Sequence, residues 1–213
     1  MSKIRSYFFA GINGVGKTTL LNAIQSSGAN VEIFKGSAKL MELLQLQPGD
    51  YASLRALPDQ IKEQAVNVMM ETVLTTDVGN DAPVLLVDAH LINYKRGEMR
   101  DATGPWMRHL NALFIVMASP EVILTRVQQD AITNIRHRDL LPEGITPLQE
   151  VEWIDRYLDV TLKRGSEISG EHGVPVFKIV NDMVPIETAV EQFYNIHAHL
   201  HDLKSENYVH NFK

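Results

Sequence analysis

The chain has no cysteine among its 213 residues, and it has neither a long hydrophobic run nor an excess of positive charge. The lack of cysteine excludes disulfides, thiol catalysis and cysteine-ligated zinc. The longest apolar run, residues 112–118, is much too short to span a membrane, although it suits a strand buried on both faces of a sheet. The formal net charge of −6 argues against the broad phosphate contacts of nucleic-acid-binding proteins. A binding site for an anion must therefore be local.

The overall composition indicates an ordinary globular protein. Hydrophobic residues make up 45% of the chain and charged residues 22%, which is typical of a single folded domain. The first ten residues lack the cationic start and the cleavable apolar stretch of a secretory signal. We therefore predict one α/β domain in the cytoplasm, with no membrane segment and with an oligomeric state that the sequence leaves open.

Apolar runs alternate with helical patterns along the chain. Strands are predicted near residues 5–10, 31–35, 83–88, 112–118 and 174–180, and helices near residues 16–27, 37–46, 58–76, 120–130, 147–170 and 185–203. This alternation predicts a five-stranded parallel sheet flanked by helices, which is a three-layer α/β fold. Residues 37–76 and 130–147 fit poorly as core, so we predict a helical insertion and a short lid over the site. Residues 203–213 are predicted to form a polar, frayed tail.

A phosphate-binding loop is predicted between the first strand and the first long helix. The segment from Gly11 to Thr19 matches the pattern G-x-x-x-x-G-K-[ST] in the required strand, loop, helix order. The backbone N–H groups of such a loop point at one anion, while Lys17 reaches the β- and γ-phosphates and Thr18 places its hydroxyl on Mg²⁺. We therefore predict ATP and Mg²⁺ as ligands in a P-loop NTPase fold, with ATP held by Gly11, Asn13, Gly14, Val15, Gly16, Lys17, Thr18 and Thr19.

A second motif is the apolar run of residues 84–87, which is followed directly by Asp88. An apolar strand that ends in an acidic residue has the form of a Walker B strand. The carboxyl end of a parallel strand opens on the same edge as the phosphate loop. Asp88 is therefore predicted either to hold the waters of Mg²⁺ or to act as a base. His90, two residues further on, faces the same side if the strand continues, and it is either a substrate contact or a structural histidine.

Arginines are the expected partners of the transferring phosphate. Phosphoryl transfer spreads negative charge over several oxygens, so the site needs cations beyond Lys17. Arg126 lies late on the helix that follows residues 112–118, and Arg136 and Arg138 fall in the turn-rich excursion. These three are predicted to act on the transferring phosphate. Arg55 lies among apolar neighbours in the first excursion and is the candidate contact to the acceptor.

Together these motifs resemble the archaeal-type adenylate kinases, a branch of the P-loop nucleoside monophosphate kinases. The resemblance rests on the paired threonines of the loop, on Asp88-Ala89-His90, on Arg136-His137-Arg138-Asp139 and on a final strand that runs into Asn181. It implies that the loop binds ATP, that the two lid arginines clamp the transferring phosphates and that Arg55 holds an acceptor monophosphate. The implied reaction is transfer of the γ-phosphoryl group of Mg·ATP to a nucleoside monophosphate.

Two departures from the family concern the acceptor and leave other functions open. Residues 101–106 only approximate the family's Gly-x-Pro turn, and Gln149 is followed by Arg156 where an arginine four residues on is expected. One alternative is a P-loop kinase that phosphorylates a hydroxyl of a small metabolite or nucleoside, with Asp88 as the base. Another is a nucleotide-dependent assembly factor that hydrolyses ATP slowly and exposes an apolar patch around Val66, Met69, Met70 and Val73.

Overall fold

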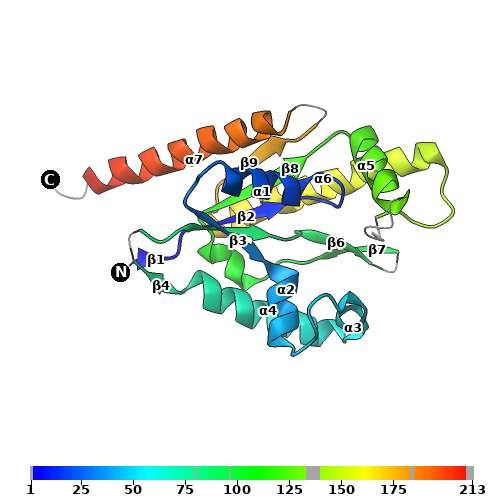
Figure 1. Ribbon diagram of the computed structural model, residues 1–213, viewed down its shortest axis with the longest axis horizontal. Helices are drawn as coiled ribbons and strands as arrows, with labels where there is room; N and C mark the ends of the chain where they lie inside the picture. Colours follow the sequence, from blue (N-terminus) through cyan, green and yellow to red (C-terminus); the bar gives the residue numbers. More distant parts are fainter. Residues whose placement is uncertain (1, 80, 96, 133–139, 183–184, 210–213) are drawn as a thin grey trace.

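The computed structural model describes residues 2–79, 81–95, 97–132, 140–182 and 185–209, with side chains described up to residue 200. Its central feature is a five-stranded sheet in the order β3-β5-β2-β8-β9, in which every neighbouring pair of strands is parallel. Its strands are β2 (Ser6–Ala10), β3 (Val31–Lys35), β5 (Val84–Asp88), β8 (Ala112–Met117) and β9 (Val176–Val180). The predicted sheet is confirmed, and all five carboxyl ends open on one edge (Figure 1).

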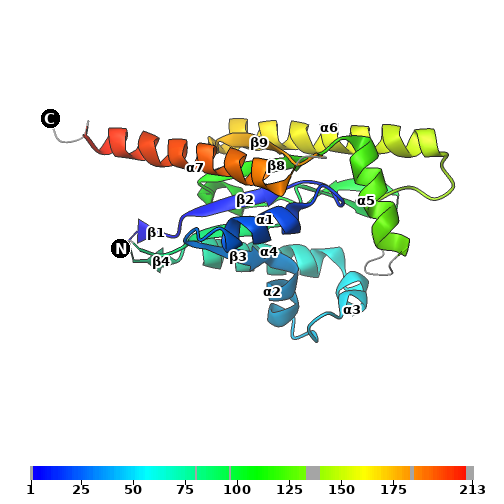
Figure 2. The same cartoon turned by 45° about the horizontal axis from the view of Figure 1, so that its top comes forward.

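Helices cover both faces of this sheet, as Figures 1 and 2 show. On one face, α1 (Lys17–Ser26) packs against α7 (Ile186–Val209). The other face carries α4 (Asp59–Leu74), the 3₁₀ helix η1 (Pro105–His109) and α6 (Pro147–His172), while α5 (Pro120–Ile132) packs on α6. No helix in the described part of the chain is long and apolar enough to cross a membrane.

Some of the elements differ from the prediction. The insertion at residues 37–76 is helical as expected, and it consists of α2 (Gly36–Leu43), α3 (Tyr51–Ala56) and α4. Three features were missed: the antiparallel hairpin of β6 (Ile92–Lys95) and β7 (Glu98–Asp101), the short pair of β1 (Ser2–Lys3) and β4 (Asp77–Val78), and η1. The helix α7 continues to Val209, six residues beyond the predicted end at residue 203, while the frayed character of the tail stays a prediction.

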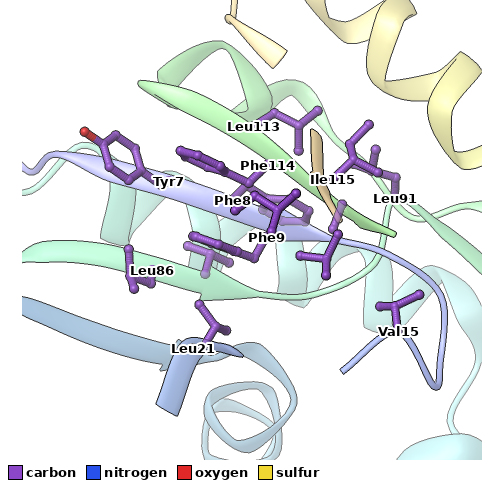
Figure 3. Close-up of a cluster of buried hydrophobic side chains, with 14 of the residues drawn as sticks. Tyr7, Phe8, Phe9, Val15, Leu21, Leu86, Leu91, Leu113, Phe114 and Ile115 are labelled. Carbon is purple, nitrogen blue, oxygen red and sulfur yellow. The ribbon is translucent and has the colours of Figure 1, made fainter. Parts of the chain in front are cut away.

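Aromatic side chains of the central strand β2 form the core on both faces of the sheet (Figure 3). Phe9 stacks on Phe114 of β8 with a centroid distance of 4.9 Å, whereas Phe8, on the opposite face, packs against Trp106 of η1 at 5.6 Å. All five residues of β2 are buried, and each buried aromatic side chain contributes roughly 1.5–3 kcal/mol of hydrophobic stabilisation. The strand that leads into the phosphate loop is thereby held rigidly.

Ion pairs fix the β6–β7 hairpin between α4 and α6. Asp59 in the first turn of α4 contacts Nζ of Lys95 at 2.6 Å and Nη1 of Arg100 at 3.1 Å. The hydrogen bonds from Lys95 and Lys62 hold the pKa of the Asp59 carboxyl well below its usual range, so this residue stays ionised. On the other side, Nε of Arg164 in α6 lies 2.9 Å from Oδ2 of Asp101.

A buried tyrosine of α6 also supports the hairpin. The hydroxyl of Tyr157 donates a hydrogen bond to the carbonyl of Ile92 at 2.9 Å. Burial raises the pKa of Tyr157 to about 12, so the hydroxyl remains a donor across the physiological range. The tyrosine thereby ties the first residue of β6 to α6.

Candidate active site

The phosphate loop, residues 11–19, joins β2 to α1 and depends on glycines at strained positions. Gly11, Gly14 and Gly16 have φ angles of 149°, 88° and 84°. A Cβ on Gly11 would lie 2.6 Å from the carbonyl oxygen of Val116, which is backbone of the neighbouring strand. Helix α1 begins at Lys17 with no side-chain cap on its first N–H groups. These donors and the dipole of the helix make its N-terminus a site for an anion.

Gly11→Ala should disrupt the loop, because the new Cβ meets backbone that a rotamer change cannot move. We expect a loss of about 2–4 kcal/mol in the free energy of unfolding, from steric overlap together with the unfavourable φ angle. Gly28→Ala is the matched control, since its φ is 87° but nothing lies within 4 Å of the added Cβ. Urea titration of both variants checks this, and equal losses would contradict the close packing of Gly11.

Two side chains converge on the carbonyl oxygen of Gly11. Lys17, which is 7% exposed, places Nζ at 2.7 Å from this oxygen, and Nδ1 of His90 also lies at 2.7 Å. A carbonyl only accepts hydrogen bonds, so Nδ1 of His90 carries its proton. His90 therefore supports the loop and also lines the cavity beside it. Its predicted contact with a substrate stays a prediction.

Thr18 and Asp88 meet at the mouth of the loop. The hydroxyl of Thr18 donates to Oδ2 of Asp88 at 3.0 Å, because β5 pairs directly with β2 and its last residue lies opposite Phe9. A hydroxyl and a carboxylate are the hard oxygen ligands that Mg²⁺ prefers, and Mg²⁺ usually takes only one or two protein ligands beside phosphates and water. The two residues therefore fit the predicted metal, although none of the described residues form a cluster of three metal-ligating side chains.

A cavity of about 380 Å³ extends from the loop towards α4 and η1. One end is formed by the phosphate loop and by Asp88, and the far wall is mostly apolar. The apolar wall consists of Leu40, Val66, Met69, Met70, Ala102 and Trp106. The methionine-bearing side of α4 thus faces this cavity and the core, which argues against the exposed apolar patch expected of an assembly factor.

Among the described residues that line this cavity, the basic side chains are Lys17 and His90. Arg55 does not line this cavity. It lies in the last turn of α3, and its side chain is exposed. The role predicted for Arg55 as an acceptor contact therefore has no support from its position. Arg136 and Arg138 lie outside the described residues, and the lid to which they were assigned remains a prediction.

Arg126 makes contacts that the sequence did not predict, and its role on the transferring phosphate stays a prediction. Its guanidinium donates to the carbonyls of Gly14, Val15, Asn181 and Asp182 at 3.0–3.4 Å, and so it binds the outer side of the loop.

The sequence alone did not assign a role to Asn181. An asparagine directly after a strand that ends at the active edge was the signal that could have indicated one.

A family model described as "AAA domain" matches residues 10–143, a segment that contains the phosphate loop and the Asp88 strand. The chain belongs to the AAA domain family. No curated protein matches the sequence of this AAA domain protein. In this protein β5 lies directly beside β2, so Asp88 and the phosphate loop share one edge with no strand between them.

Solved kinase structures share the fold of this AAA domain protein. The shikimate kinase of Acinetobacter baumannii in complex with shikimate has a TM-score of 0.59 and 11% identity, with 92% of this chain and 93% of that chain covered. The shikimate kinase of Bacteroides thetaiotaomicron has a TM-score of 0.50 and 14% identity, with 91% and 98% covered. A gluconokinase of Sinorhizobium meliloti 1021 has a TM-score of 0.51 and 16% identity, with 99% of each chain covered. The fold is therefore the P-loop NTPase fold found in these kinases, as predicted.

Proposed function

We propose that this protein is an ATP-dependent kinase that phosphorylates a hydroxyl group of a small molecule. The observation that carries the proposal is the position of Asp88, whose carboxylate lines the cavity and accepts from Thr18 at the mouth of the phosphate loop. A hydroxyl acceptor must lose a proton, and a carboxylate beside the γ-phosphate is suited to take it. The structural likeness to shikimate kinases and a gluconokinase agrees with this class of acceptor.

The chain's own residues would carry out the transfer as follows. The loop amides hold the phosphates of ATP, and Lys17 moves from the Gly11 carbonyl to the β- and γ-phosphates, while His90 keeps its hydrogen bond to that carbonyl. Thr18 would hold Mg²⁺, which neutralises charge on the phosphate oxygens when bound, and the Asp88 carboxylate would then act as the base rather than as a direct metal ligand. The acceptor oxygen bonds to the γ-phosphorus, the bond to the bridging oxygen breaks, ADP leaves, and Asp88 receives the hydroxyl proton.

The cavity wall constrains the acceptor. Its apolar side chains favour a compact molecule with an apolar or ring face, and the few polar groups nearby, those of Ser37, Asn93 and His90, suit its hydroxyls. None of the described arginines lines this cavity, so a strongly anionic acceptor would find few counter-charges there. A nucleoside or a ring-bearing alcohol fits these properties best.

A nucleoside monophosphate is the second candidate acceptor. The observation that favours it is the wall of Trp106, Met69 and Leu40, which also suits a planar base. In this case the acceptor phosphate needs cations that the described wall does not offer, and the lid arginines Arg136 and Arg138 are the predicted source. ADP release from Mg·ATP with nucleosides, nucleoside monophosphates, shikimate, gluconate and other hydroxyl compounds distinguishes the two. Stimulation by hydroxyl compounds supports the proposal, and stimulation by monophosphates alone would overturn it.

Met69→Asp should raise the KM for the acceptor about 10- to 100-fold and leave the KM for ATP unchanged. The reason is the loss of apolar contact at the far wall, where burial of one such side chain is worth roughly 1.5–3 kcal/mol. Val68→Asp is the matched control, because Val68 is the next residue of α4 but is 61% exposed. Steady-state kinetics of both variants provides the measurement. An equal effect of the two substitutions would mean that Met69 of α4 does not contact the acceptor.

A further inference from the structure

A buried asparagine at the end of β9 reaches the back of the phosphate loop. Asn181 is 4% exposed, and its Nδ2 donates to the carbonyl oxygen of Val15 at 2.8 Å. Its own main-chain N–H donates to the carbonyl of Met117 at 2.7 Å, which extends the β8–β9 ladder by one residue. The side chain is thus presented to the loop by backbone that the sheet already fixes.

The same carbonyl receives a second donor. Nη1 of Arg126 lies 3.3 Å from the Val15 oxygen, 3.4 Å from the Gly14 oxygen and 3.0 Å from the main-chain oxygen of Asn181. Asn181 and Arg126 therefore form one unit, the carbonyl clamp, on the outer side of the loop. The clamp packs closely against the loop, because a Cβ on Gly16 would overlap Nδ2 of Asn181.

The clamp determines which way two peptide groups of the loop face. In a trans peptide the C=O and the N–H point in opposite directions. A donor that holds the Val15 carbonyl on the outer side thus directs the N–H of Gly16 towards the phosphate side, and the bond from Arg126 to the Gly14 carbonyl does the same for the N–H of Val15. These N–H groups belong to the anion cradle, whose strength depends on their being oriented before the ligand arrives.

We propose that Asn181 is a positioning residue for the phosphate cradle. Its amide locks the Val15–Gly16 peptide with the N–H inward, so that ATP binds without reorganisation of the loop. The role is distinct from that of Lys17, because Asn181 holds the outer side of the loop and acts on the phosphates through the backbone. This role does not depend on the identity of the acceptor. A failure of the proposed acceptor class would therefore leave the role of Asn181 unaffected.

Two substitutions of Asn181 test this, with a closely matched control. Asn181→Asp keeps the volume and removes the donor, and Asn181→Leu removes it without adding charge. Gln192→Glu is the control, because Nε2 of Gln192 in α7 donates to the carbonyl of Val180, the residue next to Asn181, at 3.1 Å. The control makes the same amide-to-acid change and removes the same kind of bond, but it does not contact the loop.

The first readout is amide hydrogen exchange of residues 14–18 in the ligand-free protein, which reports how readily this segment opens without any phosphate present. The second is calorimetric binding of inorganic tripolyphosphate and of Mg·ATP. We expect faster exchange and about tenfold weaker binding of both ligands in the Asn181 variants, with wild-type values in Gln192→Glu. The KM for ATP should rise by the same factor, while kcat and the KM for the acceptor stay unchanged.

Unchanged exchange together with unchanged tripolyphosphate affinity in Asn181→Leu would overturn the proposal. Weaker binding in Asn181→Asp alone would overturn it as well, since charge repulsion rather than peptide orientation would then be the cause. If the leucine variant does not fold, Asn181→Ser takes its place as the neutral variant, because a serine hydroxyl is too short to reach the Val15 carbonyl from the same Cα.

Discussion

Lys17→Ala should lower kcat/KM for ATP by about 10³-fold or more, which is the largest effect we expect from a single substitution. The lysine places the one buried ammonium group among the described residues beside the anion cradle. Its loss removes a point charge from the β- and γ-phosphates at the stage when their negative charge is redistributed. The fold should survive, because the Gly11 carbonyl keeps its hydrogen bond from Nδ1 of His90 at 2.7 Å.

The measurement is steady-state ADP release with the best acceptor, together with the thermal midpoint of unfolding. Lys39→Ala is the control, because Lys39 is an exposed lysine of the neighbouring helix α2 whose ammonium pairs with Glu42 at 2.8 Å. It should retain wild-type turnover, since an exposed ion pair contributes little. A loss of less than about tenfold in Lys17→Ala, with the fold intact, would mean that phosphate binding at this loop does not drive the activity.

The sheet and the phosphate loop were predictable because their determinants are local. The five strands are short apolar runs, and each lies within two residues of its predicted ends. The loop is specified by glycines at φ angles that other residues rarely adopt, at a fixed spacing from Lys17. The pairing of β5 with β2 then brings Asp88 within 3.0 Å of Thr18, as expected for the end of a parallel strand.

The β6–β7 hairpin could not be predicted because its determinants are distant in sequence. Its strands are polar and short, and ion pairs with Asp59 and Arg164 hold them in place. A window of ten residues contains neither partner. The same reason explains why the contacts of Arg126 were not predicted. The carbonyls that it contacts belong to residues 14–15 and 181–182, which only the folded sheet brings together.

The far wall of the cavity shows a further limit of sequence patterns. Val66, Met69 and Met70 lie at helical spacing, which is equally typical of a core-facing stripe and of a binding wall. Only the packing of α4 against η1 reveals that part of this stripe faces a cavity that also contains Asp88. The shape of the acceptor site is therefore set by this packing and not by the motifs.

Asp88→Asn should reduce kcat by about 10²–10⁴-fold while leaving the affinity for ATP within a few-fold of wild type. Asparagine has the same shape, and its Oδ1 still accepts from the hydroxyl of Thr18, so the mouth of the loop keeps its geometry. The group that is lost is the carboxylate that removes a proton from the acceptor hydroxyl. Turnover at saturating substrates and calorimetric binding of Mg·ATP measure the two effects separately.

The dependence on Mg²⁺ distinguishes this role from a purely metal-binding one. A monophosphate acceptor is already ionised near neutral pH, so it needs no base, and the loss of Asp88 would then act through Mg²⁺ placement. In that case a higher Mg²⁺ concentration should restore much of the turnover of the variant. A hydroxyl acceptor predicts that turnover stays low at any Mg²⁺ concentration, because the proton still has no acceptor. Recovery with Mg²⁺ would therefore transfer the assignment to the nucleoside monophosphate kinases and make the cations of the acceptor site the next residues to find.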